Sequence, residues 1–218
     1  MYLPVKRFFD LLFSFIGLIL LSPLLIPVMI ILKCTGEHEV FFLQKRIGYR
    51  NREFSIWKFA TMVKDSPLKG TGEITLRNDP RVTPAGRFLR KTKINELPQV
   101  LNVLGGSMSL VGPRPLMKKS FDLYSEEVKK VVYNTHPGMT GIGSVIFRDE
   151  EKIISQSQDI QAAYHAVFQH KGEVEMWYQK NISFYTDLVI LFLTGWYIFF
   201  PHSRLAYKVF PSLPRHQF

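Results

Sequence analysis

The sequence predicts an α/β (mixed α+β) fold that is mostly helical, contains one small β-hairpin and begins with a membrane segment. Three observations predict it. Residues 11–32 carry no ionised side chain, residues 40–59 hold two strand-like stretches around a turn, and helix start and stop signals recur later. The 218-residue chain therefore divides into a membrane segment, residues 1–34, and a membrane-associated domain, residues 35–218.

Composition limits the class of protein. Hydrophobic residues make up 46% of the chain, which excludes a wholly disordered protein. Cys34 is the only cysteine, which excludes an intramolecular disulfide framework and a multi-cysteine zinc site. The net charge of +10 indicates an anionic partner. Charge alone does not choose among nucleic acid, lipid headgroups and a phosphorylated substrate.

The apolar run from Leu11 to Leu32 is the first predicted element. As a helix rising about 1.5 Å per residue, it is long enough to cross a hydrocarbon core of roughly 30 Å. No small-residue cleavage site of a signal peptide follows it. Cations flank both ends, so they set no orientation. Ser22-Pro23 and Pro27 favour a kink, which leaves two alternatives: a kinked span, or a helix-break-helix that returns to the side it entered.

Two further features are predicted at the membrane interface. Asp10 lies at the entrance of the apolar run, where it is expected to pair with Lys6 or Arg7. A second apolar run, residues 188–200, is too short for an ordinary span and is rich in aromatic side chains. Its residues leave two readings open, an interface-lying helix and a buried core helix.

The middle of the chain predicts a hairpin followed by a basic helix. Residues 40–45 and 53–59 are strand-like, and the turn-rich residues 48–51 separate them. Thr83 followed by Pro84 is typical of a helix N-cap with proline at the first helical position.

Two more helices follow. Apolar residues recur at i, i+3, i+4 and i+7 from Leu97 to Leu104, which predicts an amphipathic helix that starts near residues 95–98 and ends at Gly105. Residues 125–134 predict another helix, with acidic residues near its start and lysines later.

A cluster of cations is the first candidate for chemistry. Five lie within thirteen residues: Arg81, Arg87, Arg90, Lys91 and Lys93. They precede a helix N-terminus, which favours phosphate binding; a basic face against anionic headgroups is the alternative. Nucleic acid is disfavoured because no aromatic residues alternate with these cations. The histidines show no zinc-ligand spacing, and motifs for nucleotide triphosphates or serine hydrolysis are missing.

A proline-flanked arginine is the second candidate. In Gly112-Pro113-Arg114-Pro115, the two prolines fix the backbone around one arginine. Its guanidinium can therefore be aimed at a phosphate or a planar base.

These and other short segments agree in order and spacing with one family. Over residues 5–145 the chain resembles the small monotopic phosphoglycosyl transferases, a group of bacterial sugar transferases, and residues 150–218 resemble them more loosely. The segments that carry the resemblance are Lys6-Arg7 with Phe9-Asp10, Ser22-Pro23, Phe42 with Gln44, Arg46 and Gly48, Lys58-Phe59 with Thr61-Met62, Leu89-Arg90-Lys91-Thr92, Glu96-Leu97-Pro98-Gln99, and Gly112-Pro113-Arg114-Pro115.

The resemblance implies an activity and a location. It implies transfer of a sugar 1-phosphate from a UDP-sugar to polyprenyl phosphate (undecaprenyl phosphate), with Mg²⁺ as cofactor and UMP as product. It also implies a re-entrant membrane helix hairpin over residues 1–34 and a monotopic catalytic domain on the cytoplasmic face of the bacterial inner membrane. Several members of the family act as dimers, so the resemblance also makes a homodimer possible.

The resemblance also implies a set of site residues. Asn95 and Glu96 fall where relatives carry an Asp-Glu pair, in which the aspartate attacks the sugar-linked phosphate and the glutamate supports the metal. Glu96 is thus the expected magnesium ligand. Substrate binding is carried over to Lys58, Arg90, Lys91, Gln99 and Arg114. Ala60 is a second departure, because relatives usually carry arginine there.

Asn95 changes the expected chemistry, because an amide lacks the anionic oxygen of a carboxylate nucleophile. Three mechanisms remain: direct attack by polyprenyl phosphate, which we rank first, attack by Glu96, and conversion of Asn95 to aspartate. Asn95 also suits the N-cap of the helix that follows it.

Three hypotheses of function follow. The first is a phosphoglycosyl transferase that starts a surface glycan, with Asn95 in place of aspartate. The second is a catalytically inactive paralogue that binds lipid or nucleotide, or partners an active transferase. The third is a basic membrane-surface adaptor without a pocket, which would not bind a UDP-sugar.

Overall fold

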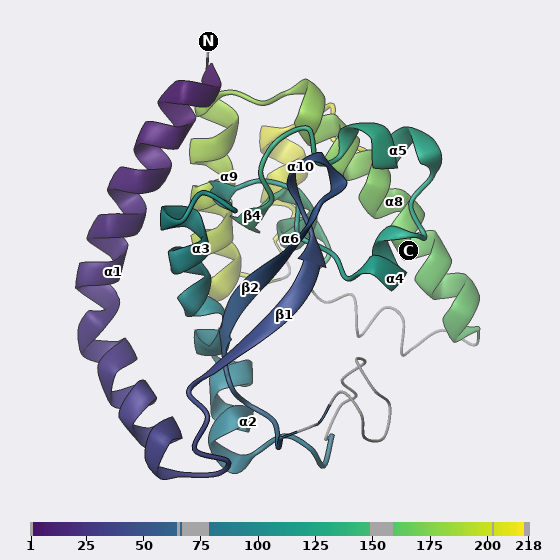
Figure 1. Ribbon diagram of the computed structural model, residues 1–218. Helices are drawn as coiled ribbons and strands as arrows, with labels where there is room; N and C mark the ends of the chain where they lie inside the picture. Colours follow the sequence, from purple (N-terminus) through teal and green to yellow (C-terminus); the bar gives the residue numbers. More distant parts are fainter. Residues whose placement is uncertain (1, 65, 67–78, 149–158, 202, 216–218) are drawn as a thin grey trace.

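The computed structural model describes residues 2–64, 66, 79–148, 159–201 and 203–215 (Figure 1). It is a mixed α/β fold, mostly helical, as the sequence predicts. The elements follow in this order: α1 (Tyr2–Cys34), β1 (Phe41–Ile47), η1 (Tyr49–Asn51), β2 (Glu53–Phe59), α2 (Pro84–Lys91), η3 (Ile94–Gln99), α3 (Val100–Leu104), β3 (Ser109–Val111), α4 (Lys118–Phe121), α5 (Glu126–Val131), β4 (Gly138–Thr140), α6 (Ile142–Ile146), α8 (Ile160–Lys180), α9 (Phe184–Phe199) and α10 (Leu205–Val209).

Helix α1 is continuous and curves along one side of the molecule (Figure 1). It contains Pro23 and Pro27 without a break, so the helix-break-helix expected at Ser22-Pro23 is not seen. A proline at position 23 cannot donate to the carbonyl of Ile19, four residues earlier. The Ser22 hydroxyl donates to that carbonyl at 2.7 Å instead. This substitution explains how the helix bends without ending.

The N-terminal end of α1 is held to the domain by buried polar contacts. Lys6 forms a buried ion pair with Asp187 of α9, and Tyr2 donates to the same carboxylate. Asp10 does not pair with Lys6 or Arg7 as expected. It accepts hydrogen bonds from the Ser109 hydroxyl at 2.7 Å and the Leu110 backbone N–H at 3.0 Å, both in β3.

The C-terminal end of α1 is held to the same domain by apolar contacts. Leu25, Val28 and Leu32 are buried in one cluster with Phe59 of β2 and Leu89 of α2. Both ends of the helix therefore attach to one body, and the helix lies along that body. The 18-residue window that is apolar enough to cross a membrane is only 17% buried.

The outer face of α1 continues into α9 as an exposed apolar surface. The two helices lie side by side near their N-terminal ends, where the rings of Phe9 and Phe184 are 5.3 Å apart (Figure 1). Helix α9 buries Ile190 and Leu193 in the core, yet Leu188 and Phe192 are more than half exposed. The predicted core helix is thus partly confirmed, because one face of α9 is buried, and its other face is an exposed apolar surface on which the interface reading stays a prediction.

The predicted hairpin is confirmed. Strands β1 and β2 pair antiparallel, with Gln44 opposite Ile56 and Phe42 opposite Lys58. Because side chains alternate between faces, Gln44 and Arg46 share a face with Ile56 and Lys58. Gln44 and Arg46 of β1 therefore lie on the same face of the hairpin as Lys58 of β2.

The helix signals are confirmed at α2 and α5 and need one correction at η3. Thr83 and Ser125 cap α2 and α5, accepting from the backbone N–H of Gly86 and Val128. The helix predicted from residues 95–98 to 104 is a 3₁₀ turn, η3, followed by α3. Asn95 is not its N-cap: it lies inside η3, whose N-cap is Lys93, because Lys93 adopts a left-handed conformation and turns the chain first.

A short parallel pair was not predicted. Strands β3 and β4 pair Ser109 with Gly138 and Val111 with Thr140. Three residues each are too few to show a strand pattern in the sequence. A Cβ atom on Gly138 would lie 2.1 Å from the backbone nitrogen of Gly112, so glycine is required for this close approach. The pair directs the Gly112–Pro115 segment toward the hairpin.

We predict that Asp187→Asn destabilises the protein by about 3 kcal/mol, because it leaves the buried Lys6 ammonium without its counter-charge. The measurement is denaturant unfolding of the full chain in detergent micelles. Asp122→Asn is the matched control, since its pair with Lys118 is exposed, and we expect a change within about 0.5 kcal/mol. Equal effects of the two variants would contradict the account.

Candidate active site

The carboxylate of Glu96 lies between two cations. Its Oε1 atom accepts from Lys58 Nζ at 3.3 Å and from an Arg114 guanidinium nitrogen at 3.3 Å. The three residues come from β2, η3 and the segment after β3, which are far apart in the sequence. Lys58 is mostly buried, whereas the Arg114 side chain is 39% exposed and therefore remains accessible to a ligand.

The charges of this cluster favour the ionised form of the Glu96 carboxyl group. Burial raises the pKa of the Glu96 carboxyl, but the charges of Arg114, Lys58 and Lys93 outweigh burial and hold the pKa well below its usual range. Burial lowers the pKa of Lys58 to about 8, although Glu96 opposes this shift. The carboxylate is therefore firmly ionised and weakly basic, while Lys58 is near the middle of its titration at mildly alkaline pH.

Asn102 fixes the position of η3 and α3 against the hairpin. Its side-chain oxygen accepts from the Trp57 backbone N–H at 2.9 Å, and its amide nitrogen donates to the Ser55 carbonyl at 2.8 Å. A buried amide that pairs with both an N–H and a carbonyl of one strand fixes the position of its own helix along that strand. Glu96 is thereby held opposite Lys58.

The segment carrying Arg114 is fixed by Tyr133. The Tyr133 hydroxyl donates to the Arg114 carbonyl at 2.8 Å and accepts from the Leu116 backbone N–H at 3.1 Å. Arg46 adds a longer contact to the Pro115 carbonyl at 3.5 Å. The backbone around Arg114 is thus held by side chains as well as by its two prolines.

A small basic cleft forms between these segments. Its lining combines Lys58, Gln99 and Arg114, which the sequence predicts as substrate-binding residues, with residues it does not: Arg46, Ile56, Pro115 and Gly138. Four of the predicted site residues, Glu96 among them, therefore meet in one place. The cluster combines cations with one ionised carboxylate, a set that suits a phosphate-bearing ligand and its metal ion.

The cations of α2 do not join this cluster in the described contacts. Arg90 donates to the Thr61 hydroxyl at 2.9 Å and contacts the Met62 sulfur, and Lys91 is exposed on α2. Arg81 does not belong to an open phosphate site as predicted, because it forms a buried ion pair with Asp79. The run of five cations therefore divides into structural and surface-facing members.

Asn95 is buried beside Glu96 in the chain, with 8% of its surface exposed. Its side-chain oxygen has no hydrogen-bond partner among the described residues. A buried acceptor without a partner is uncommon in folded proteins and is often satisfied by water or an ion.

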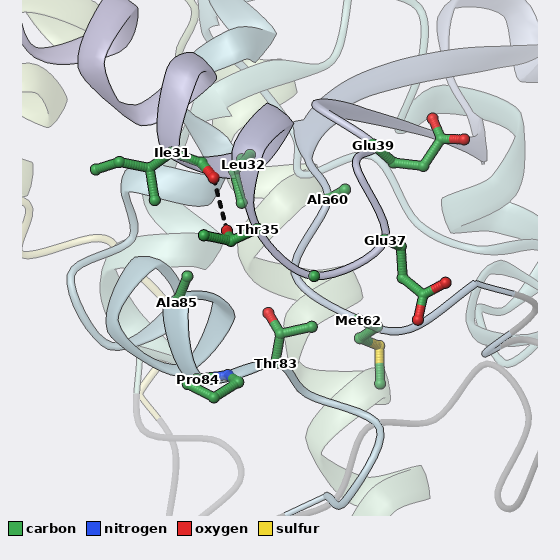
Figure 2. Close-up of a pocket in the computed structure, with 11 residues that line it drawn as sticks. Ile31, Leu32, Thr35, Glu37, Glu39, Ala60, Met62, Thr83, Pro84 and Ala85 are labelled. Carbon is green, nitrogen blue, oxygen red and sulfur yellow. Dashed lines mark hydrogen bonds between the residues drawn. The ribbon is translucent and has the colours of Figure 1, made fainter.

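A larger cavity lies elsewhere, between the C-terminal end of α1 and the start of α2 (Figure 2). It has a volume of about 330 Å³ and is mainly apolar; Ala60, Met62, Glu37 and Glu39 are among the residues that line it. The two departures from the family pattern thus lie in different places, Ala60 in this cavity and Asn95 next to Glu96. The charged cluster, not the larger cavity, holds the groups suited to phosphate chemistry.

Sequence reasoning missed three residues that shape the site. Arg46 belongs to one of the motifs that carry the family resemblance. It lies two residues from Gln44 in a strand, and this spacing was the signal that both residues share a face with Lys58. Asn102 and Tyr133 lie inside helical patterns, where nothing local marks a side chain that bonds a distant backbone. Their roles depend on tertiary contacts.

Fold and site together define a protein with one long apolar helix and a basic cleft suited to phosphorylated ligands. The chain belongs to the bacterial sugar transferase family, whose model matches residues 1–201. It is 34% identical over 195 residues, 88% of its length, to the UDP-N-acetylgalactosamine-undecaprenyl-phosphate N-acetylgalactosaminephosphotransferase of Aeromonas hydrophila, of which it spans 43%. It is 35% identical to the exopolysaccharide production protein ExoY of Rhizobium meliloti, covering 87% of this chain and 83% of that protein.

We predict that Glu96→Gln lowers the pKa of Lys58 below its value of about 8, because the carboxylate raises that pKa and the neighbouring arginines lower it. Competitive acylation at a series of pH values, read by mass spectrometry, measures the pKa. The exposed Lys45 serves as internal control. An unchanged Lys58 titration in the variant would contradict the contact.

Proposed function

We propose that this protein transfers a sugar 1-phosphate from a UDP-sugar to polyprenyl phosphate and so begins a surface glycan or exopolysaccharide. The observation that carries the proposal is the Lys58–Glu96–Arg114 cluster in a chain of the sugar transferase family. The names of the two relatives supply the chemistry: one is an undecaprenyl-phosphate phosphotransferase, and the other is an exopolysaccharide production protein.

The proposed location is the cytoplasmic face of the bacterial inner membrane, with the chain entering one leaflet only. The contacts of α1 support it, since Lys6 at one end and Leu32 at the other both attach to the same domain. A helix tied down at both ends presents its apolar outer face to lipid more readily than it spans. The exposed aromatic residues of α9 extend that face.

The cations are assigned to two phosphate groups. Lys58 and Arg114 suit the diphosphate of the UDP-sugar, because they flank the cleft and carry charge-assisted donors; Gln99 lines the same cleft. Arg90 and Lys91 suit the phosphate of the polyprenyl acceptor. Their helix packs through Leu89 on the membrane helix α1, which places them beside the apolar surface where the lipid would lie.

Magnesium fits the oxygen donors of this site. Mg²⁺ commonly takes one or two protein oxygens and completes its shell with water and substrate phosphates. Glu96 offers a carboxylate, and the buried Asn95 oxygen is an acceptor without a partner among the described residues. When bound, the ion would neutralise charge on the diphosphate. No group of three or more acidic, histidine or cysteine ligands occurs in the described chain, which favours such a substrate-completed site over an all-protein one.

The proposed reaction is direct attack in a ternary complex. A phosphate oxygen of polyprenyl phosphate forms a bond to the sugar-linked phosphorus, and the bond from that phosphorus to the oxygen of the UMP phosphate breaks. The products are polyprenyl-diphospho-sugar and UMP. Glu96 is poorly suited to be the nucleophile because Lys58 and Arg114 hold its charge and keep its pKa low. Lys58 and Arg114 instead orient the transferring group and stabilise its charge.

A catalytically inactive paralogue is the second candidate. Two residues of this chain favour it through the family resemblance, which implies a nucleophilic aspartate where Asn95 stands and an arginine where Ala60 stands. Such a protein would bind the nucleotide or the lipid without turnover, or partner an active transferase.

We predict that Glu96→Gln lowers UMP release by at least about 100-fold, because the cluster loses the charge that holds Lys58 and Arg114 in place. The assay supplies a panel of UDP-sugars, polyprenyl phosphate and Mg²⁺ to the full chain in detergent. Glu53→Gln, which removes an exposed hairpin carboxylate, is the control and should keep full activity. Full activity of Glu96→Gln would contradict the assigned role.

We predict that the native chain turns over in that assay and does not require Asn95→Asp. Direct attack needs no carboxylate at position 95, so both proteins should release UMP. Turnover by Asn95→Asp alone would overturn direct attack and support the inactive paralogue, whose pocket is intact but whose nucleophile is missing.

A further inference from the structure

A buried carboxyl group lies beside the backbone of Arg114. Glu175 of α8 is 3% exposed. Its Oε1 atom accepts from the Arg114 backbone N–H at 3.4 Å. Its Oε2 atom has no hydrogen-bond partner among the described residues. A charged residue type in such a place is unusual, because burial of a carboxylate costs free energy unless it is compensated.

The surrounding chain leaves room for this carboxyl group. A Cβ atom on Gly143 of α6 would lie 2.3 Å from Glu175 Oε1, so the carboxyl group rests directly on the backbone of that glycine. Any larger residue at position 143 would displace it. The close approach limits where the Glu175 side chain can lie.

Glu175 and Tyr133 hold the same residue by its two backbone groups. Tyr133 donates to the Arg114 carbonyl, and Glu175 accepts from the Arg114 N–H. The prolines on both sides of Arg114 have no backbone N–H group. The Arg114 N–H is therefore the backbone donor through which a side chain can hold this part of the segment. The guanidinium then reaches Glu96 at 3.3 Å.

We propose that Glu175 is a positioning residue: through the backbone of Arg114 it aims the guanidinium at the diphosphate of a UDP-sugar in the basic cleft. The inference rests on the proposed function, since it assigns the ligand of Arg114 from it. Glu175 itself is not one of the residues that line the cleft, and it contacts the lining only through the backbone of Arg114.

The charges around Glu175 give this role a signature in pH. Burial raises the pKa of the Glu175 carboxyl to about 7, although the Arg114 N–H, Lys171 and the Arg114 charge oppose the shift. Tyr133 and Tyr178 also face it. The native state therefore binds this proton more tightly than the unfolded chain does. Native stability should fall as pH rises from about 4.5 to about 7, and Glu175→Gln should lack this loss.

The test is calorimetric binding of UDP with Mg²⁺ to the full chain in detergent. Glu175→Leu removes the acceptor and should weaken binding about tenfold, the effect of misplacing one charged contact. Glu175→Gln keeps an oxygen acceptor and should bind within about threefold of the native chain. Glu173→Gln alters an exposed carboxylate on the same helix and should bind UDP as the native chain does.

Gly143→Ala provides a second route that leaves Glu175 in place. It pushes the carboxyl group from the Arg114 N–H and should weaken UDP binding as Glu175→Leu does. Thermal unfolding between pH 5 and pH 8 monitors folding, and the advantage of Glu175→Gln over the native chain should grow with pH. Native-like UDP binding by Glu175→Leu or Gly143→Ala would overturn the inference. A native chain that fails to bind UDP would overturn the proposed function instead, and the inference with it.

Discussion

The carboxylate of Glu96 joins two segments of the chain that each contribute a cation to the same place. Glu96 neutralises Lys58 from the hairpin and Arg114 from the segment after β3, and these two repel each other without it. The surrounding contacts serve this arrangement: Asn102 fixes η3 against β2, and Tyr133 and Glu175 hold the backbone of Arg114. The same charges that hold the carboxylate make it a weak nucleophile, so the geometry that builds the cleft also limits its chemistry.

In the proposed function, the contacts of α1 with the rest of the chain set where the cleft lies relative to lipid. Helix α1 is attached at its N-terminal end through Asp10 and Lys6, and at its other end through an apolar cluster that includes Leu89 of α2. The next residue of α2 is Arg90, so the cations assigned to the lipid phosphate begin where the membrane helix ends. Direct attack would require a nucleotide held by Lys58 and Arg114 and an acceptor phosphate held by Arg90 and Lys91 to meet in a ternary complex.

The sequence predicts the elements whose signals are local and misses those that depend on distant contacts. The hairpin, the cap at Thr83 and the helix after Ser125 follow from residue types at fixed spacing. The prolines alone leave a kinked helix and a broken helix open, and the break at Ser22-Pro23 is implied by the resemblance; the Ser22 hydroxyl instead satisfies the carbonyl that proline leaves free. Asn95 has the residue type of an N-cap, but the left-handed turn at Lys93 starts η3 before it. Lys58, Glu96, Gln99 and Arg114 were found through family motifs; Glu175 was not, because a lone glutamate in a helix carries no local sign of burial.

The stereochemistry at the transferred phosphorus distinguishes direct attack from a mechanism with a phosphoryl-enzyme intermediate. A UDP-sugar made chiral at the sugar-linked phosphorus with oxygen isotopes is converted by the native chain, and the configuration of the lipid product is determined. One in-line displacement inverts the configuration, whereas a phosphoryl-enzyme intermediate requires two displacements and retains it. Direct attack predicts inversion. Retention would show that a residue of the chain attacks first, and the assignment of Asn95 and Glu96 as non-nucleophilic groups would be wrong.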